Sequence, residues 1–206
     1  MDENVSSNLA VLCGTVAAAP VYSHSSRSES FYTFPLEIMR LSGTADRINV
    51  ILRSELLESL EVSCDEKLRV IGELRSFNNK SGVGHRLIIS VFARSLTLGG
   101  HLPFNQIQLS GILCKTPTLR HTPLGREICD IILAVNRRYG RADYLPCIAW
   151  GMVAQQVANM PVGSRLTVEG RIQSRTYTKN VAGTLTEHTA YEVSSMRPAD
   201  IEEFLL

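Results

Sequence analysis

Aromatic and arginine side chains gather in the second half of this 206-residue chain. Four tyrosine or tryptophan rings and six arginines fall between positions 137 and 177, and the candidate binding residues among them are Tyr139, Tyr144, Trp150, Tyr177, Arg137, Arg138, Arg171 and Arg175. A ring that lies outside a hydrophobic core can stack on any planar base, and a guanidinium group can bind a phosphate. This combination indicates a surface for a flexible polyanion, provided that the fold presents these side chains together.

The charge of the chain is divided unevenly between its halves. The whole chain has a formal net charge of only +1. Residues 1–100 carry 10 basic and 11 acidic side chains, a net charge of −1, whereas residues 103–197 carry 11 basic and 6 acidic side chains, a net charge of +5. The second half is therefore the better candidate for binding a polyanion.

The second half repeats the first. A shift of 97 positions aligns residues of the same type over more than forty positions, and one extra residue then changes the shift to 98. The aligned pairs include Asn8/Asn105, Leu12/Leu109, Gly14/Gly111, Arg40/Arg137, Asp46/Asp143, Gly72/Gly170 and Ser76/Ser174. A repeat of this length indicates two domains, because solenoid repeats are about 20 to 50 residues long. We expect domains at 1–98 and 105–197, a linker at 99–104 and a tail at 198–206.

Each copy is predicted to be mostly β-strand. Apolar residues alternate with polar ones in the second copy from Ile107 to Leu113 and from Cys129 to Val135, which is the pattern of a half-buried strand. A short helical segment follows the third strand, with the apolar sets Leu56, Leu57, Leu60 and Val153, Ala154, Val157. Fifth strands are expected near 85–93 and 187–193. Five strands with a helix between the third and fourth predict an all-β chain of two tandem oligonucleotide-binding (OB) barrels.

The alternation also predicts which side chains point away from the core of the second copy. The predicted outward sets are Tyr144, Pro146, Ile148 and Trp150 on the third strand, and Arg171, Gln173, Arg175 and Tyr177 on the fourth. Other interpretations stay open for single residues. Trp150 could belong to the core, Tyr144 and Tyr177 could pack at a barrel end, Tyr139 could be a loop residue, and the arginines could be an ordinary solvated face.

Motifs of the second copy resemble the bacterial single-stranded DNA-binding protein family over about 105–196. The matching segments are Gly111-Ile112-Leu113 with Pro117, Leu133-Ala134-Val135-Asn136, Ala149-Trp150-Gly151, and Val168-Glu169-Gly170-Arg171 with Arg175. The family's base-stacking aromatics fall on Tyr139, Tyr144, Trp150 and Tyr177. The resemblance implies a non-enzymatic protein that binds single-stranded DNA with little sequence preference in replication, repair or recombination. It also implies a homodimer with four barrels in total.

The first copy departs from the family at the stacking positions. Ser42, Arg47, Arg53 and Asn79 stand where the second copy has its four aromatics, and Phe77 is the one ring left nearby in the sequence. We therefore expect the first barrel to bind DNA weakly or to serve in assembly.

Other functional classes find little support in the sequence. The five cysteines have neither C-x-x-C spacing nor histidines at ligand spacing, so no metal or cofactor is expected and the thiols should be reduced. No apolar run is long enough to span a membrane. Asp2 and Glu3 precede the apolar run at 9–21, where a secretory signal needs positive charge, so a cytoplasmic, nucleoid-associated protein is expected.

Two alternatives to single-strand protection remain. One is a primosome-type replication adaptor that mainly contacts partner proteins and binds DNA weakly, which the lost aromatics of the first copy favour. The other, an OB-fold enzyme or RNA-binding module, has no supporting motif. The end of the chain, Asp200–Leu206, combines acidic and apolar residues, so it could recruit replication or repair proteins, but a short helix or frayed end is also expected there.

Overall fold

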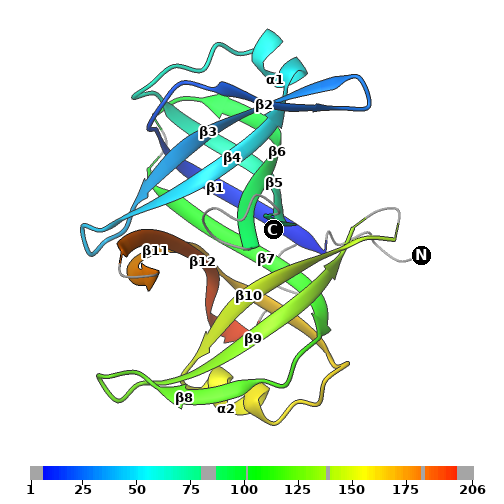
Figure 1. Cartoon of the computed structure of the whole chain (residues 1–206), viewed down its shortest axis with the longest axis vertical. Coiled ribbons are helices and arrows are strands. Elements are labelled where there is room, and N and C mark those ends of the chain that lie inside the picture. The colour runs from blue at the N-terminus through cyan, green and yellow to red at the C-terminus, as the bar shows by residue number, and fades with distance from the viewer. Residues whose placement is uncertain (1–6, 80–86, 101, 138–139, 182–183, 199–206) are drawn as a thin grey trace. The chain divides into compact units, whose positions relative to one another are not determined.

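A computed structural model describes residues 7–79, 87–100, 102–137, 140–181 and 184–198 of the chain. Within these described ranges, both sequence repeats contain six strands and one short helix, in the same order (Figure 1). The first repeat holds β1 (Asn8–Val16), β2 (Val21–Ser26), β3 (Glu29–Met39), β4 (Ala45–Arg53), α1 (Ser54–Glu58), β5 (Lys67–Asn78) and β6 (Leu87–Leu98). The second holds β7 (Phe104–Leu113), β8 (Thr118–His121), β9 (Glu127–Asn136), β10 (Ala142–Trp150), α2 (Met152–Ala158), β11 (Arg165–Val181) and β12 (Thr184–Pro198).

Five strands of each repeat close into a barrel. In the first repeat the hydrogen-bonded order is β3-β4-β6-β5-β1, and β1 also pairs with β3. In the second repeat the order is β9-β10-β12-β11-β7, and β7 also pairs with β9. In each barrel the third and fifth strands in chain order pair in parallel: β4 with β6 in the first barrel and β10 with β12 in the second. The helix follows the third ring strand in both cases, so the predicted OB arrangement is confirmed.

The same pairing register closes both barrels. Thr15 pairs with Glu37 in the first, and Ile112 pairs with Ala134 in the second. Each member of the second pair lies 97 positions after its counterpart in the first. The duplication seen in the sequence is therefore also a duplication of strand register.

Alternation fills each barrel with apolar side chains, as predicted. Residues facing inward in the first barrel have buried counterparts 97 positions later: Leu12 and Leu109, Leu36 and Leu133, Ile48 and Leu145, Val50 and Cys147. Successive side chains of a strand point to opposite faces, so burial of one set fixes the other set on the outer face. This outer face is where sequence analysis places the binding residues.

Glycines allow two strands of each barrel to approach closely. A Cβ atom on Gly72 would lie 2.2 Å from the backbone oxygen of Phe92, and one on Gly170 would lie 2.2 Å from that of Ser194. These distances are far below van der Waals contact, so the strands could not stay in place with a side chain there. Neither glycine has a positive φ, and the requirement is one of space rather than of backbone conformation.

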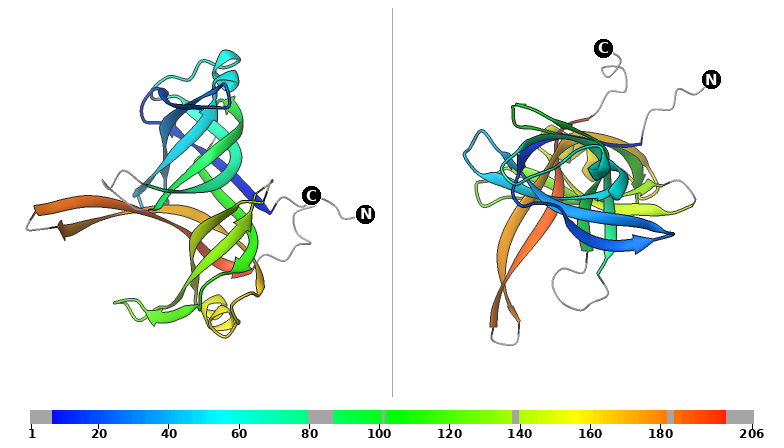
Figure 2. Two further views of the ribbon diagram at one scale, coloured as in Figure 1. Left: turned by 45° about the vertical axis from the view of Figure 1, so that its right-hand side comes forward. Right: turned by 90° about the horizontal axis from the view of Figure 1, so that it is seen from above.

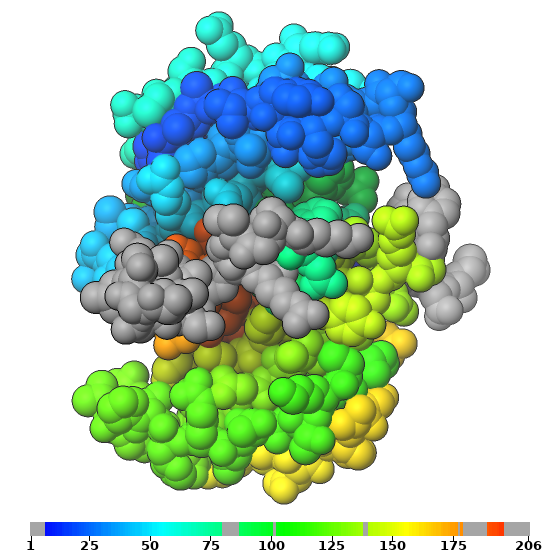
Figure 3. Space-filling model, in the orientation of Figure 1, coloured from blue at the N-terminus to red at the C-terminus, as the bar shows by residue number. Residues whose placement is uncertain are grey.

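The structure differs from the sequence prediction in two details. Each repeat has an additional strand that is exposed along its whole length: β2 pairs with β3 in the first repeat, and β8 pairs with β9 in the second. The β2–β3 hairpin forms part of the surface seen in Figure 3 (blue). The helical segments also differ from each other: α2 buries Val153, Ala154 and Val157 as predicted, whereas α1 buries no residue and ends before Leu60. The expected apolar helix face of the first repeat was therefore wrong, because its helix is too short to form one.

The chain divides into two compact units, which are described separately below. The first-repeat unit contains Ala10–Asn105 and also Ile172–Tyr191. The second-repeat unit contains Gln106–Arg171, and among the described residues it also includes 7–9 and 192–198. The strands β11 and β12 form a long ribbon (Figure 2), and its outer part is the segment that belongs to the first-repeat unit.

None of the five cysteines forms a disulfide, and Cys13, Cys129 and Cys147 are buried. Burial, aided by the negative charge of Glu192, raises the pKa of the Cys147 thiol far above its usual range. This thiol therefore stays protonated and unreactive in the folded protein. Within the described residues, no helix is long and apolar enough to cross a membrane.

Candidate nucleic-acid interface

Strand β10 presents the predicted aromatic side chains on the outer face of the second barrel. Asp143, Leu145, Cys147 and Ala149 are buried on its inner side. Tyr144 on the other side is 54% exposed, and Trp150 is half-buried. Trp150 is absent from the buried core, so the interpretation of this residue as a core tryptophan is not supported. The alternation therefore separates Tyr144 and Trp150 from the buried set, but Ile148, which was predicted to be exposed with them, is only 7% exposed, so that part of the prediction was wrong.

A hydrogen bond fixes the indole ring of Trp150. Its Nε1 donates to the hydroxyl oxygen of Ser194 on β12 at 2.9 Å. Because this bond satisfies the only polar atom of the indole, the remaining accessible surface of the ring is an apolar π system. A half-buried, oriented ring of this kind loses little conformational entropy when a base stacks on it.

A pocket on the second-repeat unit is lined in part by residues of β10 that lie between Tyr144 and Trp150 in the sequence. Pro146 and Ile148 come from the outer side of β10, and Ile132 comes from β9; the polar part of the lining includes Lys115, Thr116, Thr118, Asp130 and Glu192. Asp130 is paired with Arg120, whose Nη2 donates to the aspartate Oδ1 at 3.0 Å. The lining thus combines apolar walls with one ammonium group and two carboxylates, one of which is paired with Arg120. Lys115 and the two threonines could not be found from periodicity, because they lie in and beside a loop.

Arg171 and Arg175 are both exposed on β11, and each lies two residues from Gln173 along the strand. Arg171 belongs to the second-repeat unit, and Arg175 belongs to the first-repeat unit. Contact of either residue with DNA stays a prediction.

Arg137 has a structural role that sequence analysis did not anticipate. Its Nε donates to Asp143 Oδ2 at 2.6 Å, and its Nη2 donates to Oδ1, so the pair is bidentate. Asp143 is completely buried, and the arginine side chain is 19% exposed. The first repeat holds the same pair, Arg40 with Asp46, at positions 97 residues earlier. The arginine therefore neutralises a buried carboxylate, whether or not it also contacts DNA.

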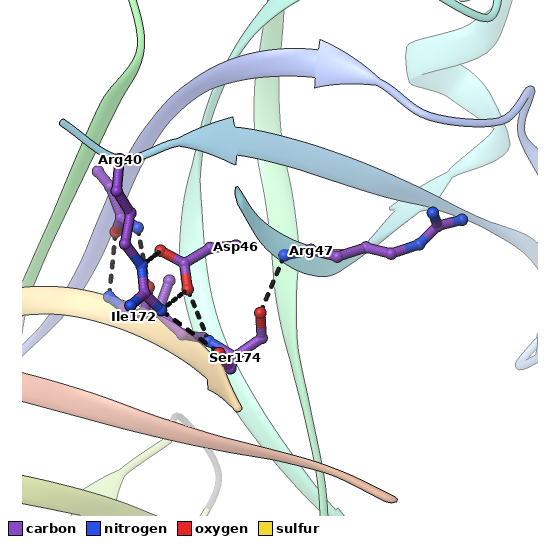
Figure 4. A network of polar contacts seen from close by, with 6 residues as sticks. Arg40, Asp46, Arg47, Ile172 and Ser174 are labelled. Atoms are coloured by element: carbon purple, nitrogen blue, oxygen red, sulfur yellow. Dashed lines mark hydrogen bonds and ion pairs between the residues drawn. The ribbon is translucent and has the colours of Figure 1, made fainter. Parts of the chain in front are cut away.

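Asp46 also binds the outer part of β11 within the first-repeat unit (Figure 4). The backbone N–H of Ser174 donates to Asp46 Oδ1 at 2.8 Å, and Arg40 Nη2 donates to the Ser174 carbonyl oxygen at 3.3 Å. The backbone N–H of Arg47 donates to Ser174 Oγ at 3.0 Å. These bonds fix the backbone of β11 one residue before Arg175. The buried aspartate of the first repeat thus helps to position a predicted DNA-binding residue of the second repeat.

Three predicted site residues are not fully described by the structure. Arg138 and Tyr139 lie outside the described residues. The backbone of Tyr177 lies in β11, but its side chain is outside the described part of the chain. Their proposed contacts with DNA stay predictions.

Two of the four first-repeat counterparts of the stacking residues, Arg47 and Arg53, form ion pairs. Arg47 Nη1 lies 2.9 Å from Glu37 Oε1, and Arg53 Nε lies 3.1 Å from Glu29 Oε2. Phe77, the ring that sequence analysis noted, is 41% exposed on β5.

Comparison with known sequences relates the second repeat to one family. The model of the single-strand binding protein family matches residues 104–197. The single-stranded DNA-binding protein B of Bacillus subtilis is 38% identical over 110 residues, which are 48% of this chain and 96% of that protein. The single-stranded DNA-binding protein 2 of Listeria monocytogenes is 40% identical over 83 residues, 37% of this chain and 52% of that protein. The chain thus spans about half the length of the first relatives that it matches.

Comparison of structures extends the similarity to both repeats. A deletion mutant of the single-stranded DNA binding protein from Thermus aquaticus superposes with a TM-score of 0.74, at 22% identity, over 96% of each chain. At this identity the similarity concerns the fold alone.

Proposed function

Because the chain belongs to the single-strand binding protein family, we propose that it binds single-stranded DNA with little sequence preference and protects it during replication, repair or recombination. The observation that carries this proposal is the outward placement of Tyr144 and Trp150 on β10, inside the segment that matches the family model. Family membership confirms the expectation of a binding protein rather than an enzyme.

The chemistry of the outer face supports sequence-tolerant binding. Stacking of a base on an aromatic ring contributes about 1–3 kcal/mol and depends little on base identity. Lys115, Arg171 and Arg175 supply positive charge for phosphates. Each phosphate contact with a single strand should lower the slope of log K against log salt by about 0.7. We therefore expect binding that weakens steeply as salt is added.

Trp150 provides the test of this proposal, because it is the only tryptophan in the chain. Its fluorescence should be quenched when oligo(dT) is added at low salt. Tyr144→Ala and Trp150→Ala should each weaken binding by roughly 5- to 150-fold, equivalent to the loss of one stacked base. The anisotropy of a fluorescein-labelled oligonucleotide measures the DNA affinity of both variants. This label is needed for Trp150→Ala, because that variant has no tryptophan fluorescence.

A matched control comes from Met152, which is 78% exposed next to the interface but carries no ring. Met152→Ala should leave the affinity unchanged, and Trp150→Phe should retain most of it. Equal affinity of the wild type for duplex and single-stranded DNA would contradict the proposal. Absence of any response at low salt would favour the primosome-type adaptor instead.

We also propose that two chains form a homodimer with four barrels, in the cytoplasm and associated with the nucleoid. The expectation of a dimer rests on the two barrels of each chain and on the resemblance noted in the sequence. Light scattering should give twice the chain mass of 22.8 kDa, and a monomeric mass at micromolar concentration would refute the dimer. Contacts with replication or repair proteins are a further part of the proposal and are not needed for DNA binding.

A further inference from the structure

The outer face of the first barrel carries its own group of rings and arginines, which we call the Phe92 cluster. It consists of His24, Phe31, Arg53, Glu73, Arg75, Phe92 and Arg94. Strand pairing places these residues side by side across the sheet: Phe31 pairs with Arg53, and Phe92 pairs with both Ile51 and Glu73. All belong to the first-repeat unit.

Three guanidinium groups surround the ring of Phe92. Their central carbons lie 5.9 Å (Arg53), 5.8 Å (Arg75) and 5.7 Å (Arg94) from the ring centroid. These distances are within the range of cation–π attraction. Arg53 and Arg94 are 44% and 46% exposed, so two of the three cations are accessible to a ligand.

Further rings continue from Phe92 across the face. Phe31 lies 6.2 Å from Phe92 between ring centroids, and His24 stacks on Phe31 at 4.8 Å with an interplanar angle of 11°. Phe31 and Phe92 are half-buried and His24 is exposed. The face already supports one stack of planar groups, which is the geometry that an additional base would join.

The cluster has more positive than negative charge. Glu73 pairs with both Arg75 and Arg94, and Glu29 pairs with Arg53. Among the ion pairs described for these residues, three guanidinium groups share two carboxylates, Glu73 of the cluster and Glu29 beside it. A phosphate can be accommodated near the excess cation, and the half-exposed pairs of Arg53 and Arg94 are weak enough in water to be exchanged for it.

The cluster occupies the place that Trp150 holds in the second barrel. Arg53 stands at the position of Trp150, 97 residues earlier. Phe92 on β6 pairs with Ile51 in the first barrel, and Ser194 on β12 pairs with Ile148 in the second. Because Ile148 lies 97 residues after Ile51, Phe92 is the counterpart of Ser194. In the second barrel a ring on β10 bonds to a small residue on β12; in the first, a ring on β6 lies beneath an arginine on β4. The aromatic ring thus lies on the third strand, β10, in the second barrel and on the neighbouring fifth strand, β6, in the first.

We propose that the Phe92 cluster is a second contact site for single-stranded DNA, in which Phe92 and Phe31 stack on bases while Arg53 and Arg94 bind phosphates. This inference rests on the proposed function, since it takes the same strand as ligand. OB folds contact about 4–16 nucleotides each. A strand long enough to reach both sites should bind more tightly than one that fills a single site, because the second contact is intramolecular.

Phe92→Leu tests the proposal while keeping an apolar side chain of similar volume at this half-buried position. For a long oligo(dT), the variant should bind roughly 5- to 150-fold more weakly, as expected for one lost stacked base. For an oligonucleotide short enough to fill one site, quenching of Trp150 should be unchanged. Tyr22→Leu is the matched control, because Tyr22 is an exposed ring of the same barrel that contacts Tyr32 instead of Phe92.

Photocross-linking gives an independent measurement. A long oligonucleotide that carries 5-iododeoxyuridine should form cross-links to peptides containing Phe31 or Phe92 in the wild type, and those at Phe92 should disappear in Phe92→Leu. If Phe92→Leu binds long DNA as tightly as the wild type and all cross-links lie in the second repeat, the inference is overturned. Quenching of Trp150 in the same experiment would show that the proposed function still holds. Absence of quenching with any oligonucleotide would instead refute the proposed function itself.

Discussion

Replacement of Arg137 by methionine is expected to lower the free energy of unfolding by about 3–5 kcal/mol. Asp143 is completely buried, and the bidentate arginine neutralises its carboxylate. Removal of the arginine leaves a charge that must be buried without this partner or be protonated. The same substitution at Arg40 should also destabilise the protein, because Asp46 is 1% exposed in the equivalent pair.

Urea denaturation in the absence of DNA measures this effect. Arg165→Met is a suitable control, since Arg165 is an exposed arginine of the second repeat and its loss should change stability by less than about 0.5 kcal/mol. The double variant Arg137→Met with Asp143→Leu should recover much of the loss, because it removes both charges together. A loss below about 1 kcal/mol for Arg137→Met would show that the pair is dispensable, and the residue could then be assigned to DNA alone.

Gly170→Ala should be the second large perturbation, with a loss of about 3 kcal/mol, at the upper end of the range for overpacking. The added Cβ would lie 2.2 Å from the backbone oxygen of Ser194, and no flexible side chain can move away to relieve the clash. β11 and β12 would have to separate at this point. Because Ser194 also accepts the hydrogen bond of Trp150, DNA affinity should fall together with stability.

Thermal unfolding and oligo(dT) titration of the same variant measure both consequences. Gly72→Ala should destabilise the first barrel for the same reason, since its Cβ would meet the Phe92 backbone oxygen at 2.2 Å. Gly100→Ala is the control, because no atom lies within 4 Å of an added Cβ there. If Gly170→Ala unfolds at the same temperature as the wild type, the close strand contact is not required.

Much of the site on β10 could be predicted from the sequence. The period-two pattern separates Leu145 and Cys147 from Tyr144 and Trp150, because neighbouring side chains of a strand cannot face the same way. The duplication was also clear from identical residues at a constant shift. Both inferences depend only on local geometry and on order along the chain.

The Phe92 cluster could not be predicted in the same way. Position-by-position comparison of the repeats finds Arg53 in place of Trp150 and so indicates a lost aromatic. The compensating ring lies on β6, a strand that is distant in sequence and adjacent only through the parallel pairing of β4 with β6. A useful signal is present in the sequence: Phe92 alternates with the apolar residues Val91 and Ala93, so it faces outward.

The two OB barrels, the general division of inner and outer faces and the family of the second repeat could be predicted from the sequence, because they follow from periodicity and from order along one chain. The partners of the polar side chains became clear only in the folded protein. It paired Arg137 with a buried aspartate, joined Ser174 to Asp46, and brought three arginines to one phenylalanine. Such partners come from separate strands, and the closure of the barrel rather than the spacing of residues sets their distances.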